Sequence, residues 1–381
     1  MTAAARSLAL KLAARKPVTP PSCASNEVLL LRPDHLGDVL LLGPALQRFR
    51  RIVPDARVTL LVGPWSGDVA AHLPGIDEIV RIPFPGFDRS ARHAPAASYR
   101  LLGTWARALR RRAPIAAVIL RDDHWWGAWL AKHAGIPIRV GADLPVVRDF
   151  LTHPVALTRP HVVEHNVALL DATARALGGE PLARPPTAVT DPLIWKTDAD
   201  ATAGANDLLA ELGVAERFIT IHPGAGAVVK RWPAARWAAV ASRLSTATNT
   251  PVVFTGSADE APLIAGIQSA MTTPSVSLAG QTPIALLAEV YRRAAVVLGP
   301  DSGPLHLAVA AGAPTVRLYG PSDPARFGPW GIERRNRAIH AGFHCRRCGD
   351  LSAKRPEGAG CMLAICEETV LEAAVSVLCD G

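Results

Sequence analysis

The stretch Gly299-Pro-Asp-Ser-Gly-Pro-Leu-His306 decides the fold class of this 381-residue chain. An apolar run, Ala294–Leu298, precedes it and stops at the glycine, which predicts a β-strand that ends there. Pro304 suits the first turn of a helix and Ser302 can cap that helix, so we expect the chain to restart as a helix over Leu305–Ala311. A strand that leads directly into a helix is typical of a parallel α/β sheet.

The end of this strand is also a predicted ligand site. Asp301 and Ser302 would lie at the carboxyl edge of a parallel strand, where open α/β sheets bind their ligands. The unpaired amides at the start of the next helix would face an anion. His306, on that helix, either packs in the helix interface or contacts a phosphate. We therefore expect a sugar phosphate or a nucleotide as the ligand.

Two further loops with glycine follow predicted strands in the same half of the chain. The first is His222-Pro-Gly-Ala-Gly-Ala-Val-Val-Lys-Arg-Trp-Pro233, in which Gly224 and Gly226 leave amides exposed and Lys230 adds a positive charge. The second is Phe254-Thr-Gly-Ser-Ala-Asp-Glu260. A plain strand-to-helix loop would explain any one of the three, but three such loops in one domain predict a pocket for a nucleotide diphosphate.

The first half carries its own motif, Arg32-Pro-Asp-His-Leu-Gly-Asp38, directly after a predicted strand. Gly37 lets a backbone come close to a ligand. The carboxylate of Asp38, at the start of the next helix, could accept a hydroxyl proton from a substrate as a general base. The alternative is an aspartate that caps the helix, and Asp34 is the competing acid.

From Val28 onward, apolar runs alternate with helical patterns, which predicts two α/β halves built of βαβ units, with parallel sheets facing a cleft. We expect a tail over residues 1–25, a first domain over 26–192, a second domain over 193–342, and a cysteine-containing tail with a helix over 343–381. Strands are expected at Val28–Leu31, Val58–Val62, Ile79–Ile82, Ala116–Leu120, Arg139–Gly141, Phe218–His222, Val252–Thr255, Val296–Leu298 and Thr315–Tyr319. Helices are expected at Val39–Phe49, Trp126–Ala134, His161–Leu177, Ala199–Leu212, Ala234–Thr246, Glu260–Met271, Pro283–Ala294 and Leu305–Ala311.

Composition narrows the classes of protein. Lys and Arg number 41 against 33 Asp and Glu, and the formal charge of +8 suits a phosphorylated substrate or an anionic surface. Nucleic acid is not an expected partner, since no dense basic run interleaved with aromatic residues occurs. No uninterrupted apolar run reaches the ~18 residues of a membrane span. The basic N-terminal segment is either a frayed tail or an amphipathic helix that touches anionic lipid, and without a secretion signal we expect a cytoplasmic location.

Other residues have competing interpretations. Four late cysteines have the number but not the spacing of a zinc ribbon, and a structural zinc competes with reduced thiols or a disulfide. These are Cys345, Cys348, Cys361 and Cys366. The acids in Asp122-Asp-His-Trp-Trp126 could bind a metal or an acceptor, but a solvated loop with Trp125 packed beneath it is the favoured interpretation. His165 and Asn166 lie on a helical pattern and are expected to be satisfied polar groups.

Taken together, these motifs resemble glycosyltransferase family 9, the ADP-heptose heptosyltransferases of the lipopolysaccharide inner core. The resemblance covers about Val28 to Leu378. It is carried by Leu-Gly-Asp-Val-Leu40, the His222 loop with Lys230, Phe254-Thr-Gly-Ser, the Gly299 stretch and Leu318-Tyr-Gly-Pro-Ser-Asp-Pro324.

The resemblance implies a GT-B fold with two Rossmann-like domains, the acceptor bound by the first and the nucleotide sugar by the second. It implies inversion at the anomeric carbon with no cofactor and no catalytic metal, Asp38 as the base and Lys230 on the diphosphate. Arg32, His35 and Gly37 would lie on the acceptor side. The implied donor contacts are His222, Gly224, Ala225, Gly226, Lys230, Thr255, Gly256, Asp301, Ser302, Gly303 and His306.

The donor is expected to be ADP-heptose or another nucleotide-diphosphate sugar. The acceptor is expected to be a hydroxyl of a glycan, a glycolipid or a small molecule, and the loops over Pro83–Ser98 that would shape its site match no known pattern. Two alternatives stay open: a nucleotide-sugar isomerase or epimerase of the same architecture, and a non-catalytic protein that binds nucleotide sugars. The sequence does not indicate the oligomeric state.

Overall fold

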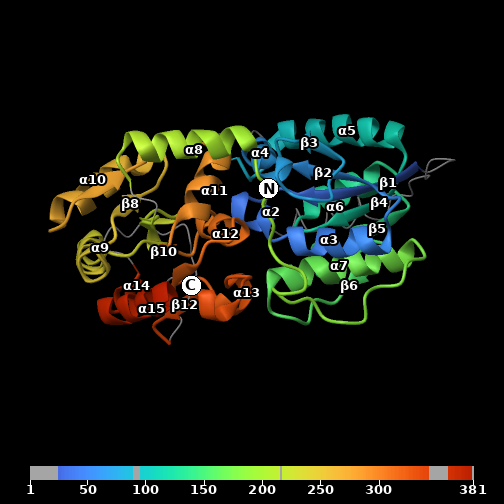
Figure 1. Ribbon diagram of the computed structural model, residues 1–381. Helices are drawn as coiled ribbons and strands as arrows, with labels where there is room; N and C mark the ends of the chain where they lie inside the picture. The colour runs from blue at the N-terminus through green and yellow to red at the C-terminus, as the bar shows by residue number, and fades with distance from the viewer. Residues whose placement is uncertain (1–24, 89–94, 215–216, 343–358, 380–381) are drawn as a thin grey trace. The chain divides into compact units, whose positions relative to one another are not determined.

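A computed structural model describes residues 25–88, 95–214, 217–342 and 359–379. The chain forms two compact units, Met1–Pro186 and Thr187–Gly381 (Figure 1). The division falls in the extended segment between helix α7 (Val162–Ala176) and helix α8 (Ala199–Glu211). No helix in the described ranges is both long enough and apolar enough to cross a membrane.

The first unit contains a six-stranded sheet in the order β3-β2-β1-β4-β5-β6, with every neighbouring pair parallel. Its strands are β1 (Ser25–Arg32), β2 (Arg57–Val62), β3 (Glu78–Arg81), β4 (Pro114–Ile119), β5 (Ile138–Ala142) and β6 (His153–Val155). Its helices are α2 (Leu36–Leu40), α3 (Gly43–Ile52), α4 (Gly67–Ala71), α5 (Pro95–Arg112), α6 (Trp125–His133) and α7. This strand order is that of the Rossmann fold, which places the topological switch point between β1 and β4.

One expected helix is wrong in the first unit. The pattern over Val39–Phe49 predicted a single helix, but the chain forms α2 and α3 with a break at Leu41 and Leu42. Pro44 stands in the first turn of α3. Because proline has no N–H and its ring clashes with the preceding turn, an unbroken helix cannot run through that position.

The second unit repeats the topology, with a parallel sheet in the order β12-β11-β10-β7-β8-β9. Its strands are β7 (Ile219–Ile221), β8 (Val252–Phe254), β9 (Ser275–Ser277), β10 (Val296–Pro300), β11 (Thr315–Tyr319) and β12 (Asn336–His340). Its helices are α8, α9 (Ala234–Thr248), α10 (Ala261–Ala270), α11 (Ile284–Arg293), α12 (Gly303–Ala310), α13 (Pro324–Phe327), α14 (Gly360–Leu363) and α15 (Glu367–Cys379). Counted from β7, the order is again that of the Rossmann fold, and its switch point lies between β7 and β10.

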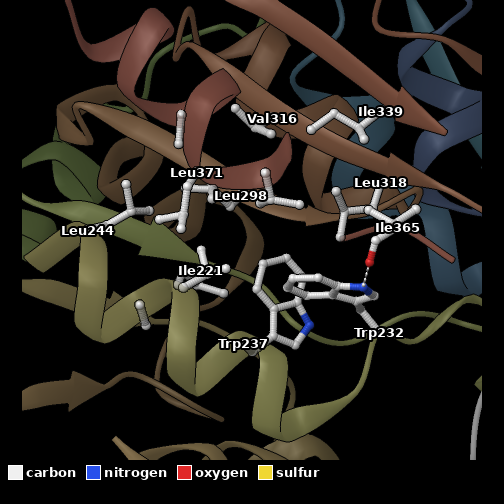
Figure 2. Packing of buried hydrophobic residues seen from close by; sticks show 14 of the residues in the cluster. Ile221, Trp232, Trp237, Leu244, Leu298, Val316, Leu318, Ile339, Ile365 and Leu371 are labelled. Atoms are coloured by element: carbon white, nitrogen blue, oxygen red, sulfur yellow. Dashed lines mark hydrogen bonds between the residues drawn. The ribbon is translucent and has the colours of Figure 1, made fainter. Parts of the chain in front are cut away.

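Two tryptophans anchor the core of the second unit under the His222 loop (Figure 2). The rings of Trp232 and Trp237 meet edge to face, with centroids 4.9 Å apart. The Trp232 indole N–H donates to the carbonyl of Ile365 at 3.3 Å, which joins this loop to the segment between α14 and α15 (Figure 2). Because both rings are buried, the loop that leads into α9 has a fixed base.

Candidate active site

In the first unit, the loops after β1 and β4 meet at the switch point through a buried ion-pair network. Arg32, the last residue of β1, donates to the Leu120 carbonyl at 2.6 Å, and its Nε lies 3.4 Å from Asp34 Oδ2. Arg121, from the loop after β4, donates to Asp34 Oδ1 at 2.6 Å. Asp34 is therefore a buried acid between two guanidinium groups, and it binds the two loops together.

Asp38 has different surroundings. It stands in the first turn of α2, and its side chain is 35% exposed. Its Oδ1 lies 3.5 Å from Arg32 Nη2, which is a long contact that leaves the carboxylate accessible. The N-cap residue of α2 is His35, so the alternative in which Asp38 caps the helix does not hold. Of the two acids in the motif, Asp38 is therefore the one whose carboxylate is exposed to solvent.

The expected acceptor contacts Arg32, His35 and Gly37 all belong to this loop. Arg32 is buried, and its guanidinium is occupied by the Leu120 carbonyl and the two carboxylates, so its role here is to position the acids. The His35 ring lies 5.7 Å from that of Trp65. Gly37 is the second residue of α2.

The loop after β4 contains a buried histidine. His124 lies among aromatic rings, with centroid distances of 5.3 Å to Phe84, 5.4 Å to Phe87 and 6.3 Å to Trp126. Neither ring nitrogen has a hydrogen-bond partner in the described parts of the chain, and burial lowers the pKa of His124 to about 4. The sequence placed Trp125 beneath this loop, but the buried ring is Trp126, whose N–H donates to the Ser98 carbonyl at 3.1 Å.

The polar pair on α7 is satisfied only in part, because His165 Nδ1 and Asn166 Oδ1 are buried with no hydrogen-bond partner among the described residues. His165 Nε2 lies 2.6 Å from the Arg159 carbonyl, and Asn166 Nδ2 donates to the Leu41 carbonyl at 3.0 Å. Across the described residues, no group of three His, Cys, Asp or Glu side chains is arranged to hold a metal ion, which includes the Asp122 loop. Cys361 is buried and Cys366 is exposed, while Cys345 and Cys348 lie outside the described residues.

In the second unit, the loops after β7 and β10 are joined by a second ion pair, in which Asp301 is buried and Lys230 is partly buried. Lys230, at the end of a 3-10 turn (Val228–Lys230), donates to Asp301 Oδ2 at 2.7 Å. Its Nζ also lies 3.4 Å from the Asp301 carbonyl. Because an ammonium has three N–H donors, one remains for a ligand. The sequence predicted both residues as site members, and the structure brings them into contact.

A second cluster fixes the histidine of the first glycine loop. His222 Nδ1, Thr255 Oγ1 and the Tyr291 hydroxyl lie within 3.1–3.2 Å of one another. Burial lowers the pKa of His222, against an opposing effect of Glu260, and burial also raises the pKa of Tyr291. Thr255 is fully buried with its hydroxyl engaged, and its N–H donates to the Ile221 carbonyl at 3.0 Å. Tyr291 of α11 was missed by the sequence motifs.

Glu260 explains why two glycines are needed beside it. A Cβ atom on Gly224 would lie 1.8 Å from Glu260 Oε1, and one on Gly256 would lie 3.2 Å from Glu260 Oε2 and 2.9 Å from Ile264 Cδ1. The carboxylate accepts from the Ser257 N–H at 2.9 Å and lies 3.8 Å from His222 Nε2. The first two glycine loops therefore converge on this carboxylate. The other two predicted members of the first loop, Ala225 and Gly226, follow Gly224 directly, and Ala225 is buried.

Helix α12 begins at Gly303 with Ser302 at the N-cap, as the sequence predicted. The predicted capping hydrogen bond is absent: the buried Ser302 hydroxyl has no partner in the portion of the chain that the structure describes. His306 Nε2, one turn into the helix, lies 3.8 Å from Asp301 Oδ1. The hydroxyl and the amides of this helix start can thus serve a ligand.

The two Rossmann-like units are those of a GT-B enzyme, and solved structures share the fold. A glycosyl transferase family 9 structure from Veillonella parvula matches 95% of this chain and 99% of its own with a TM-score of 0.74 at 23% identity. The ADP-heptose lps heptosyltransferase II of Escherichia coli matches 93% of this chain and 99% of its own with a TM-score of 0.69 at 22% identity.

Sequence comparison makes the assignment specific. The model of glycosyltransferase family 9 (heptosyltransferase) matches residues 104–353, and the chain belongs to this family. Lipopolysaccharide heptosyltransferase 1 of Pseudomonas aeruginosa is 28% identical over 339 residues, which cover 84% of this chain and 85% of the relative. Lipopolysaccharide heptosyltransferase 3 of Escherichia coli is 25% identical over 304 residues, which cover 77% and 83%. The predicted family, fold and enzyme class, a glycosyltransferase, are confirmed.

Proposed function

We propose that this enzyme transfers a heptose from ADP-heptose to a hydroxyl group of the lipopolysaccharide core. The family and the names of its relatives support this donor and acceptor class. The observation that carries the proposal is the Lys230–Asp301 pair, because it places a partly buried positive charge at the switch point where a Rossmann-like unit binds its ligand. Family membership does not favour the isomerase or the non-catalytic alternative.

In the proposed reaction, Asp38 is the general base. The acceptor oxygen forms a bond to the anomeric carbon of the heptose while Asp38 takes the hydroxyl proton, and attack from the face opposite ADP inverts the configuration. Arg32 and Asp34 act on substrate only through the position of this loop, since both are buried in contacts within the protein.

As the new bond forms, the bond from the anomeric carbon to the β-phosphate oxygen breaks, and its electron pair leaves with ADP. Lys230 and the amides at the start of α12 would stabilise the charge that develops on the diphosphate. The Ser302 hydroxyl would donate to a phosphate oxygen. These groups supply the positive charge, so the proposal includes no metal and no cofactor.

The donor side would also use the backbone of the loops at His222 and Thr255, with His306 beside Asp301. The acceptor side would use the loop from Arg32 to Asp38. Because a core acceptor is a glycolipid, we propose that the enzyme works in the cytoplasm at the inner face of the membrane, with the chain contacting that surface peripherally.

The test combines binding with transfer. Calorimetric titration with ADP, UDP and GDP should show selective binding of ADP, and incubation with ADP-heptose and a heptose-deficient core glycolipid should give a product heavier by one heptose in mass spectrometry. NMR of the new glycosidic linkage should show an inverted anomeric configuration. Preference for UDP or GDP would refute ADP-heptose as the donor and indicate a sugar carried on that other nucleotide. Hydrolysis or isomerisation of ADP-heptose without an acceptor would refute the proposed transfer.

A further inference from the structure

Arg317 is a buried cation near the donor site that none of the sequence motifs contains. It lies in the middle of β11, with 0% of its surface exposed. Its Nη1 lies 3.1 Å from His306 Nδ1 and donates to the Tyr319 hydroxyl at 3.2 Å. Its Nε and Nη2 have no hydrogen-bond partner, and it forms no ion pair, within the described ranges. The protein therefore keeps a charge in its interior whose nearest polar neighbour is a histidine ring.

The contact places a positive charge against that ring. Arg317 Nη1 lies 3.1 Å from His306 Nδ1 and 3.3 Å from Nε2, so it is almost equally close to both nitrogens. A guanidinium can only donate, and a neutral imidazole has one nitrogen that accepts, whereas both nitrogens of a protonated ring donate. The contact therefore suits the neutral ring. Nε2 also lies 3.8 Å from Asp301 Oδ1.

The same contact disfavours a second proton on the ring. Arg317 and Tyr319 face His306 from β11, and burial raises the pKa of Tyr319, which leaves its hydroxyl neutral. Asp301 faces it from the end of β10 but is bound to Lys230. On α11, which also packs against α12, Glu289 and Arg292 pair with each other, and the guanidinium reaches the Ala311 carbonyl at the far end of α12.

We propose that Arg317 is a positioning residue that holds His306 as a neutral imidazole beside the donor diphosphate, and that its buried charge adds to the attraction for that anion. The presence of the diphosphate rests on the proposed function, because that function supplies the ligand. The charge state of His306 does not depend on it.

The unliganded protein gives the first test. Nitrogen-15 NMR of the histidine rings, with the His306 signal assigned through a His306→Gln variant, should show a neutral ring from pH 8 to pH 5.5. A second proton taken up within this range would overturn the proposal. In Arg317→Met, which removes donor and charge with a side chain of similar length, His306 should take up that proton, whereas Arg317→Lys should keep the parent form.

The second test uses ADP as the probe. At pH 8, Arg317→Met should bind ADP about tenfold more weakly than the parent, and at pH 5.5 the difference should shrink to about threefold, because protonated His306 replaces the lost charge. The protonation of ADP itself changes with pH in the same way for both proteins, so it cancels in the ratio of their affinities. Arg48→Met, which removes a buried arginine from α3 in the first unit, should lower stability and leave the ratio at one.

The outcomes separate the two ideas. A variant-to-parent ratio that stays constant with pH would overturn the role of Arg317, even if ADP binds well. Failure of the parent to bind ADP would refute the proposed donor, and the ring spectra would then still support or overturn the assignment of His306. Should Arg317→Met fail to fold, the parent and Arg317→Lys spectra decide.

Discussion

Replacement of Asp34 or Asp38 by asparagine should separate a structural acid from a catalytic one. Asp34 accepts from Arg121 at 2.6 Å and lies 3.4 Å from Arg32 Nε, and its side chain is only 6% exposed. Asp38 is 35% exposed and has a 3.5 Å contact with Arg32. Asp34→Asn should therefore lower the free energy of unfolding, and Asp38→Asn should lower the rate of transfer.

The magnitudes follow from these contacts. Removal of one partner from a buried ion pair costs ~3–5 kcal/mol when the other charge is left alone. After Asp34→Asn, however, Arg121 keeps Asp123 at 2.7 Å and Arg32 keeps Asp38, so we expect a loss of about 2–4 kcal/mol. Asp38→Asn should change stability by less than about 1 kcal/mol, as for exposed pairs, while transfer falls by about 10²–10⁴ with loss of a general base.

The assay is urea unfolding of both variants beside the rate of transfer from ADP-heptose under saturating donor. Donor affinity should stay near that of the parent for Asp38→Asn, because its position in the first unit is outside the donor loops. If Asp34→Asn unfolds at the parent's urea concentration yet loses turnover, and Asp38→Asn stays active, the two roles are reversed and our reasoning fails.

Lys230→Ala should weaken ADP binding at least about tenfold and cost about 2–3 kcal/mol of stability, because the buried Asp301 loses its partner; calorimetry and unfolding measure the two effects. Gly224→Ala should slow transfer at least about tenfold, since its Cβ would lie 1.8 Å from Glu260 Oε1 and displace that carboxylate. Burial lowers the pKa of His124 from 6.5 to about 4 in the folded protein. As the pH falls between those values, the unfolded chain takes up a proton on this residue and the folded protein does not, so the free energy of unfolding should decrease by up to about 3 kcal/mol. His124→Phe should remove this pH dependence in unfolding measured at a series of pH values.

Each of these three has a contrasting result. Unchanged ADP affinity in Lys230→Ala would show that Lys230 is not part of the donor site. Gly266→Ala, on α10 where no atom lies within 4 Å of the new Cβ, is the matched control for the glycine and should stabilise by up to about 1 kcal/mol without slowing transfer. A pH profile of stability that is the same with and without His124 would contradict its burial as a neutral ring.

The sequence predicted most of the strands because they are apolar runs, and those in the middle of each sheet are buried. It missed β6, β9 and β12, whose residues are only partly buried and which form no apolar run. Helix α5 was missed too, since its Arg-rich pattern follows the Pro-rich stretch at Pro83 that matched nothing. These elements lie at the edges or over the surface of the sheets, where burial imposes the weakest pattern on the sequence.

The residues of the candidate site also divide into those that the sequence predicted and those that it missed. Asp38, Lys230 and Asp301 were predicted because a βαβ unit places every strand-to-helix loop at one edge of the sheet. Tyr291 and Arg317 were not, because they lie inside α11 and β11 and reach the site only through the packing of elements. One signal was available: an arginine in the middle of an otherwise apolar strand needs a reason to be buried.

Both units have the same kind of ion pair at the switch point. In each, a cation from a neighbouring loop binds a buried aspartate that follows the first or the fourth strand: Arg121 on Asp34 at 2.6 Å, and Lys230 on Asp301 at 2.7 Å. Each pair joins two loops at the edge of the sheet where helices begin. Without the pair, only the backbone would hold those helix starts in place. The equivalence extends no further, because the charges around the two pairs differ in sign.

In the network of Asp34, the three carboxylates of Asp34, Asp38 and Asp123 outnumber the two arginines by one negative charge. Around Asp301, the buried guanidinium of Arg317 leaves one positive charge in excess over the ion pair. An excess of negative charge favours removal of a proton from an acceptor, and an excess of positive charge favours a departing diphosphate. The sign of the charge at each switch point thus supports our proposal that the base lies in the first unit and that the second unit binds the leaving group.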